Sequence, residues 1–287
     1  GRTMADVTPS VSGAAVRRRR TARLGPNLVL AAAAVFFLAP LLAMARFALQ
    51  NVPVIFLGRS TLFKNYSFEA FAKAFHAPQF QGTLVLTLKL AAATVLCTLA
   101  LLVPTALYVH LRLPKARGLV EFLTVLPYVV PPIAMVAGVA AFFRPNARWF
   151  LNSNYALVPF YVVLALPFTY RAIDAGIRSI DVRTLVDASR SLGAGWFTTM
   201  FRALIPNLMT SIVSSSFLTA TVVMGEFTIA ATLSKATFPV FTFQYQTSSA
   251  RGGVALALLA LVGTTMLLGM LTLLTRRGPR RRAVARF

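Results

Sequence analysis

The sequence predicts an all-α integral membrane protein with six transmembrane helices, because long apolar runs alternate with segments whose basic residues lie mainly on one side. The chain has 287 residues, of which 57% are hydrophobic and only 13% charged, although its formal net charge is +22. Soluble domains carry about 25% charged residues, so this chain has too few to cover a water-facing surface. The apolar content excludes intrinsic disorder, and the single cysteine excludes a disulfide scaffold.

Six uncharged windows have the length that a membrane span requires. Each is near or above the roughly 18 apolar residues needed to cross a hydrocarbon core about 30 Å thick. Backbone hydrogen bonds in lipid must close within each span, so we expect helices. The first window exceeds the apolar core of a signal peptide, and we expect it to be an uncleaved anchor. The windows are residues 28–45, 90–109, 122–143, 151–170, 203–225 and 252–275.

The basic residues indicate the orientation. If the N-terminus is cytoplasmic, 20 of the 29 lysines and arginines fall in cytoplasmic segments and 7 outside. Cytoplasmic loops are enriched in lysine and arginine, so we expect both termini inside a bacterial cell membrane. The predicted organisation is a basic N-terminal tail (1–24), a transmembrane domain (25–277) and a basic C-terminal tail (278–287). The charge therefore indicates contact with membrane lipid and not with nucleic acid.

A short amphipathic helix is expected in the outer segment 50–82. Its apolar residues recur at helical spacing and are Phe68, Phe71, Ala72 and Phe75. Such a helix can lie along the membrane face or can pack as a lid over the bundle, and we favour the lid.

The inner segment 171–202 is long for a connection in a helical bundle, where about 2–8 residues suffice. A small, largely apolar stripe precedes Gly193-Ala194-Gly195, where glycine permits a backbone reversal, and an aromatic face follows. We expect two short helices that either dock on a partner protein or rest on lipid, and the small residues favour docking. The stripe comprises Leu185, Val186, Ala188, Ser189 and Leu192, and the aromatic face comprises Trp196, Phe197 and Phe201.

The same segment resembles the EAA motif of ABC-importer permeases, which reads Glu-Ala-Ala, three residues, Gly, nine residues, Ile-x-Leu-Pro. Here Asp187-Ala188-Ser189 is followed by Gly193 and, after nine residues, by Ala203-Leu204-Ile205-Pro206. The spacing is the same throughout, whereas Asp187, Ser189, Ala203 and Ile205 replace the family's residues. Asp187 keeps the carboxylate on a shorter side chain. The resemblance covers roughly residues 60–275.

The resemblance implies the type I ABC-importer permease fold with six spans and a coupling-helix loop at about 178–206. It implies a complex of two permease subunits, the second a different chain, with two ATPases and an extracytoplasmic substrate-binding protein. ATP and Mg would be bound by the ATPase partner, and this chain would need no cofactor. The implied ATPase-docking residues are Asp187, Ala188, Ser189, Gly193, Ala203, Ile205 and Pro206.

No catalytic or metal-binding constellation is expected. A P-loop requires a Gly-Lys dipeptide, which the chain lacks, so hydrolysis must occur on another subunit. The two histidines, His76 and His110, have no cysteine partner for a zinc site. An ATPase-independent secondary transporter or channel would need coupling-ion sites or inverted repeats, which are not evident. An intramembrane enzyme is the weaker alternative.

A polar stripe on the fifth span leads toward Glu226, an acid in the hydrophobic half of the chain. Acids there usually face a cavity or a partner, so we expect the stripe to line the translocation path. Tight helix packing explains the serines and threonine equally well. Prolines interrupt the third span, as in a cavity-lining helix or a static kink. The predicted path residues are Glu226, Ser211, Ser215, Thr219, Pro131 and Pro132.

The run Gly225-Glu226-Phe227 resembles a motif of the permease branch that serves polyamines, ferric iron and oxyanions. The resemblance implies a polyamine-like substrate or another small ion.

Overall fold

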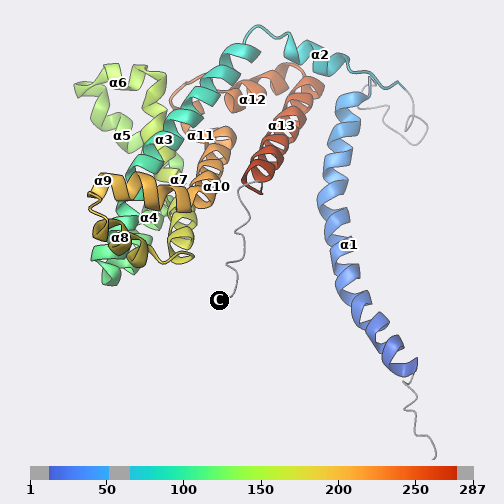
Figure 1. The fold of residues 1–287 in the computed structure, drawn as a ribbon. Helices are drawn as coiled ribbons and strands as arrows, with labels where there is room; N and C mark the ends of the chain where they lie inside the picture. The colour runs from blue at the N-terminus through green and yellow to red at the C-terminus, as the bar shows by residue number, and fades with distance from the viewer. Residues whose placement is uncertain (1–12, 52–64, 277–287) are drawn as a thin grey trace, which may run out of the picture. The chain divides into compact units, whose positions relative to one another are not determined.

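The structure is a computed structural model that describes residues 13–51 and 65–276 (Figure 1). The chain divides into two units, Gly1–Phe68 and Glu69–Phe287. The predicted C-terminal tail, 278–287, lies outside the described residues, and the predicted N-terminal tail, 1–24, is described only from Gly13 onward.

The first unit consists mainly of helix α1 (Gly13–Leu49). Its stretch Pro26–Leu49 is long and apolar enough to cross a membrane, as the first predicted span requires. An antiparallel bridge joins Gln50 to Tyr66.

The core of the second unit is made by α3 (Phe80–Arg112), α7 (Leu157–Arg178) and α10 (Ile205–Gly225), which pack against one another. Each lies in a stretch that is long and apolar enough to span a membrane. Three of the predicted spans are thereby confirmed as helices. The helix of the window 151–170 is shifted along the sequence, because α7 begins at Leu157 and includes residues 171–178 of the predicted inner segment. The buried apolar side chains of these three helices form two clusters, one in each half of the bundle. One cluster contains Leu90 and Tyr161, and the other contains Leu107 and Tyr170.

The third predicted span, 122–143, is not one continuous helix. It is divided into α4 (Arg117–Val129) and α5 (Pro132–Asn146), which meet at an angle of 87°. Proline disfavours the helical conformation of the preceding residue, and Val130 is extended with ψ 124°. The prolines therefore break the helix, where the sequence had predicted a kink.

The last helix, α13 (Ala250–Arg276), corresponds to the sixth predicted span. Within the described part of the chain, four helices meet the length and apolarity expected of a span, and the broken pair α4–α5 adds a fifth if it counts as one. In α13 the apolar stretch described, Ala250–Met266, is shorter.

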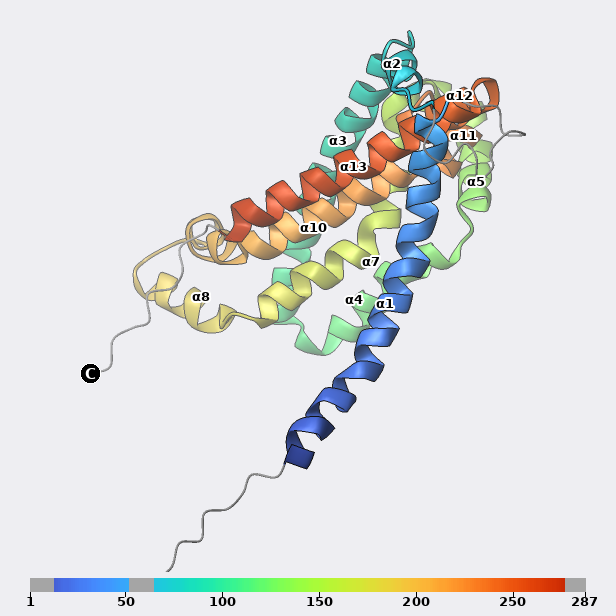
Figure 2. The same cartoon turned by 90° about the vertical axis from the view of Figure 1, so that its right-hand side faces the viewer.

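Short helices cluster at the two ends of the second unit, with α8 at one end and α12 at the other (Figure 2). The connections near α12 include the predicted outer helix, which is confirmed from Glu69 onward. It packs on α13, and Ala74 joins an apolar cluster with Phe80, Phe238 and Leu256. The buried face differs from the predicted one, because Ala70 and Ala74 are buried whereas Phe68, Ala72 and Phe75 are exposed. The remaining elements of this end are α2 (Glu69–Phe75), α6 (Arg148–Asn152), η4 (Asn154–Ala156), α11 (Thr228–Thr232) and α12 (Phe238–Ser248).

The opposite end carries the segment that was predicted to form two short helices with a glycine hinge. It contains α8 (Val182–Ser191), α9 (Trp196–Thr199) and the π-helical turn η5 (Met200–Leu204), which continues into α10. The turn η3 (Pro114–Ala116) lies between α3 and α4.

Candidate functional site: the exposed helix α8 and its surroundings

The start of α8 is fixed by an N-cap. The carboxylate of Asp181 accepts hydrogen bonds from the backbone N–H of Thr184 at 3.2 Å and from its hydroxyl at 2.6 Å. These bonds hold the pKa of Asp181 below its ordinary value. The cap is therefore in place at neutral pH and is lost as the pH falls through that lowered pKa.

One face of α8 belongs to the core of the bundle. Val182 and Val186 are buried in the apolar cluster that also contains Leu107 of α3, Ile173 of α7 and Leu208 of α10. Residues four apart lie on the same face of a helix. This face therefore ties α8 to the ends of all three core helices.

The other face of α8 is exposed. Asp187 and Ala188 lie on it, and Leu192 at the C-terminus of the helix is 88% exposed. Among the described residues, no ion pair engages the carboxylate of Asp187. The predicted stripe is thus divided, because Val186 is used by the core whereas Ala188 and Leu192 are available to a partner.

The glycine predicted as a hinge ends α8. Gly193 has φ +79°, its N–H bonds to Arg190 O at 2.8 Å, and the N–H of Ala194 bonds to Ser189 O at 3.0 Å. This is the Schellman arrangement, which requires a left-handed residue that is usually glycine. Gly193 therefore shapes the surface by ending the helix directly after Leu192.

The last three predicted docking residues lie where the connection joins α10. Ala203 belongs to the π-helical turn, and Ile205 and Pro206 begin the straight helix. Proline has no backbone N–H and therefore cannot donate the hydrogen bond of a regular α-helical turn. The wider π-helical turn that precedes Pro206 accommodates this missing hydrogen bond. Ala203 and Ile205 are half-buried and Pro206 is exposed.

A groove of about 650 Å³ runs between the end of α3 and α8. Arg112, Arg183 and Arg190 line it together with Asp187 and Trp196. Asp187 thus lies among basic side chains.

The polar stripe on α10 makes contacts with α7. The hydroxyls of Thr219 and Thr169 are 2.8 Å apart and buried, and Ser211 lies against Gly176. Ser215 is buried and bonds to Ile212 O at 2.9 Å. These are the interactions expected of tight helix packing. Whether they also line a path stays a prediction.

Replacing Gly176 with alanine should destabilise the bundle by about 1–3 kcal/mol, because the new Cβ would overlap Oγ and Cβ of Ser211. Adding Ser211→Gly should recover much of that loss, and thermal unfolding of the three variants in detergent measures the coupling. Gly138→Ala is the matched control, since a Cβ there meets no atom within 4 Å. Additive effects of the first two changes would contradict the close contact.

The predicted path acid, Glu226, caps a helix. Its carboxylate accepts hydrogen bonds from the backbone N–H groups of Ile229 at 2.8 Å and Ala230 at 3.4 Å, at the start of α11. Pro131 and Pro132 lie at the break between α4 and α5. The carboxylate of Glu226 is thus partly occupied by hydrogen bonds from the backbone, an interaction that the sequence pattern did not indicate.

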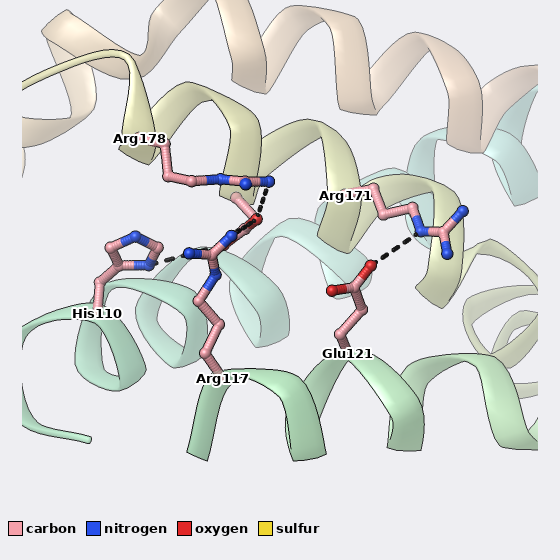
Figure 3. A network of polar contacts seen from close by, with 6 residues as sticks. His110, Arg117, Glu121, Arg171 and Arg178 are labelled. Atoms are coloured by element: carbon pink, nitrogen blue, oxygen red, sulfur yellow. Dashed lines mark hydrogen bonds and ion pairs between the residues drawn. The ribbon is translucent and has the colours of Figure 1, made fainter. Parts of the chain in front are cut away.

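A buried ion-pair cluster near α8 escaped the sequence analysis (Figure 3). Asp174 of α7, whose side chain is 3% exposed, accepts from Arg117 of α4 at 2.8 Å and from Arg178 at 2.6 Å. His110 of α3 lies 3.7 Å from the other carboxylate oxygen. The four-residue spacing of Asp174 and Arg178 could have indicated their ion pair from the sequence. The pairing with Arg117 could not be seen in this way, because Arg117 lies 57 residues from Asp174.

A second pair in Figure 3 joins the same two helices at the surface. Arg171 of α7 donates to Glu121 of α4 at 3.2 Å, and both side chains are largely exposed. Within residues 13–51 and 65–276, no group of three or more His, Cys, Asp or Glu side chains is placed to hold a metal ion.

The described residues thus form a bundle of membrane-length helices with the short helix α8 exposed at one end. The chain belongs to the family described as binding-protein-dependent transport system inner membrane component, whose family model matches residues 103–278. It is therefore a multi-pass inner-membrane permease component of a binding-protein-dependent import system. Permease subunits of this family bind no cofactor themselves. The family assignment agrees with the predicted ABC-importer permease and not with the alternatives of an ATPase-independent transporter or an intramembrane enzyme.

Individual relatives agree with this assignment. The chain is 30% identical over 153 residues to the spermidine/putrescine transport system permease protein PotB of Haemophilus influenzae, covering 48% of this chain and 53% of PotB. It is 29% identical over 101 residues to the methionine import system permease protein MetP of Bacillus subtilis, covering 35% and 45% of the two chains. The matches thus span about half the length of these relatives.

A solved structure shows the fold over nearly the whole chain. A chain from the crystal structure of a bacterial ABC transporter that imports the acidic polysaccharide alginate is similar with a TM-score of 0.68 at 15% identity. The match covers 95% of this chain and 100% of that chain.

Proposed function

We propose that this chain forms half of the translocation path for a small solute and is coupled to the ATPase through the loop from Asp187 to Pro206. The observation that carries this proposal is the division of α8 into two faces. Val182 and Val186 are held by the core, while Asp187 and Ala188 face outward.

This division suits the transmission of movement. A partner that displaces α8 acts through its buried face on an apolar cluster to which α3, α7 and α10 all contribute side chains. Close packing makes such a contact stiff and transmits a displacement to the core helices. Small residues such as Ala188 and Ser189 permit a partner to approach closely.

The proposal extends to topology and assembly. Both termini are cytoplasmic, a basic tail flanks the transmembrane domain at each end, and α8 faces the ATPase. A second permease subunit, a different chain, supplies the other half of the path, and two ATPases complete the complex on the cytoplasmic side. The opposite end of the bundle, with α12, then faces the substrate-binding protein.

The path is proposed to pass the break at Pro131 and Pro132 and the end of α10 at Glu226. Ser211, Ser215 and Thr219 lie deeper along α10, where rearrangement of the contact with α7 would expose them. The substrate is proposed to be a small ion. PotB carries the name of a spermidine/putrescine permease and MetP of a methionine permease, so the relatives favour a small solute without selecting one.

Replacing Ala188 with tryptophan tests the docking proposal. The added bulk on the exposed face of α8 should reduce co-purification of the ATPase at least about tenfold and abolish ATP-dependent uptake, as expected at the centre of an interface. Asn154→Trp, which adds the same bulk at an exposed position at the other end of the bundle, should leave co-purification unchanged. Normal ATPase assembly in the Ala188 variant would refute docking through this face.

A further inference from the structure

A cavity of about 310 Å³ is lined by residues of α11, of α12 and of the connection between them. These two helices lie at the end of the bundle opposite α8 (Figures 1 and 2). The volume of the cavity falls at the lower end of the range for small-molecule sites. The polar groups that line it are Ser234, Lys235 and Gln244, and Phe227 and Phe243 form an apolar wall.

Lys235 is the unusual member of this lining. It is only 8% exposed, and its ammonium donates one hydrogen bond to Asn152 O at 2.8 Å. No carboxylate in the described ranges lies within ion-pair distance of it. An ammonium has three donors, so two remain beyond the bond to Asn152. Burial without an anion lowers the pKa of Lys235, because water no longer stabilises its charge.

Hydrogen bonds of the backbone around the cavity hold Lys235 in place. Its backbone N–H bonds to Ala230 O at 2.8 Å in a turn where Ser234 has φ +54°, a conformation that serine seldom adopts. The next helix is fixed from the other side, since the N–H of Phe238 donates to the buried hydroxyl of Thr87 on α3 at 2.8 Å. The rings of Phe227 and Phe243 lie 5.0 Å apart between their centres.

We propose that this cavity binds the anionic group of the transported solute, a carboxylate or a small oxyanion, through Lys235 with Gln244 and Ser234 beside it. A buried cation is costly unless an anion compensates it, and the cavity that Lys235 lines provides a place for that anion. The two phenylalanine rings can accommodate an apolar part of the solute. Glu226 does not provide the compensating charge, since its carboxylate is bonded to the start of α11.

This inference rests on the proposed role of the chain in solute passage, but its test does not depend on ATPase docking. The test measures saturable binding of radiolabelled sulfate to the purified importer complex in lipid nanodiscs. Lys235→Gln should remove one sulfate site per permease chain or weaken it at least about tenfold, as expected for a charge-assisted hydrogen bond. Sites on the ATPases are present in both samples and cancel in the comparison.

Four further variants test the assignment of the site. Lys73→Gln, which neutralises an exposed lysine paired with Glu69, should leave sulfate binding unchanged. Lys235→Arg should retain binding, and Gln244→Leu should weaken it several-fold, so the proposal remains testable if Lys235→Gln does not fold. In the Ala188→Trp background, where the ATPase should be lost and uptake abolished, Lys235→Gln should still remove the same sulfate site.

Equal sulfate binding by wild type and Lys235→Gln would overturn the proposal. It would also be overturned if Lys235→Gln weakened docking of the substrate-binding protein while sulfate binding stayed normal, because the lysine would then pair with a partner's carboxylate. Saturable binding of spermidine in place of sulfate at this cavity would equally contradict an anion site.

Discussion

Replacing Asp174 with alanine is expected to lower the free energy of unfolding by about 3 kcal/mol, near the low end of the range for breaking a buried ion pair. The carboxylate is almost fully buried and accepts from Arg117 and Arg178 together. Without it, two guanidinium groups face each other, with His110 close by and no compensating anion. Both arginines are partly exposed, so water still stabilises their charges. The expected loss of unfolding free energy therefore lies at the lower end of that range.

Denaturant unfolding in detergent, followed by tryptophan fluorescence, measures this loss. The matched control is Glu121→Ala, which breaks the surface pair with Arg171 between the same two helices and should cost less than about 1 kcal/mol. Arg117→Ala should have an intermediate effect, since Arg178 still compensates the carboxylate. Equal losses for Asp174→Ala and Glu121→Ala would show that burial does not distinguish the two pairs.

The spans could be predicted from sequence because their signal is local. An uncharged run of sufficient length is a helix in lipid wherever it lies in the fold, and α3, α7 and α10 follow that rule. The 87° break between α4 and α5 could not be predicted to the same extent. Pro131 and Pro132 indicate an interruption, but the angle depends on how neighbouring helices pack around the freed backbone groups.

The details of the sites depend on contacts between distant segments. Asp174 and Arg117 come together only because α4 packs on α7, and Lys235 reaches Asn152 across 83 residues of sequence. On α8 the small stripe was visible, but periodicity alone does not tell which face the core will use. The Asp181 cap and the valines at 182 and 186 decide it, and they leave Ala188 outside.

Glu226 has a backbone partner that the sequence pattern did not indicate. An acidic residue within an apolar segment indicates a function if its carboxylate would otherwise be an unpaired charge in lipid. The structure offers another partner, because the chain turns after Gly225 and presents the first N–H groups of α11 to the carboxylate. That turn is a feature of backbone geometry, and the composition of the span contains no sign of it.

The second large effect is expected at Leu192. Its side chain is 88% exposed in a connection that no predicted span includes, and Gly193 turns the chain directly after it. An apolar side chain held in this position by a capped helix is suited to fill a pocket on a partner. Leu192→Asp should therefore weaken binding of the ATPase by at least about thirtyfold, which corresponds to the roughly 2 kcal/mol of an interface hot spot.

Titration of the purified ATPase onto the permease complex in nanodiscs measures this affinity. Leu113→Asp is the matched control, because Leu113 is also an exposed leucine, beyond the end of α3 and outside α8. It should leave the affinity within about threefold, as expected away from a hot spot. An equal loss in both variants would point to a general effect of negative charge on this face, since both substitutions add one acid beside the basic groove. A loss confined to Leu192→Asp would show that the end of α8 itself enters the ATPase.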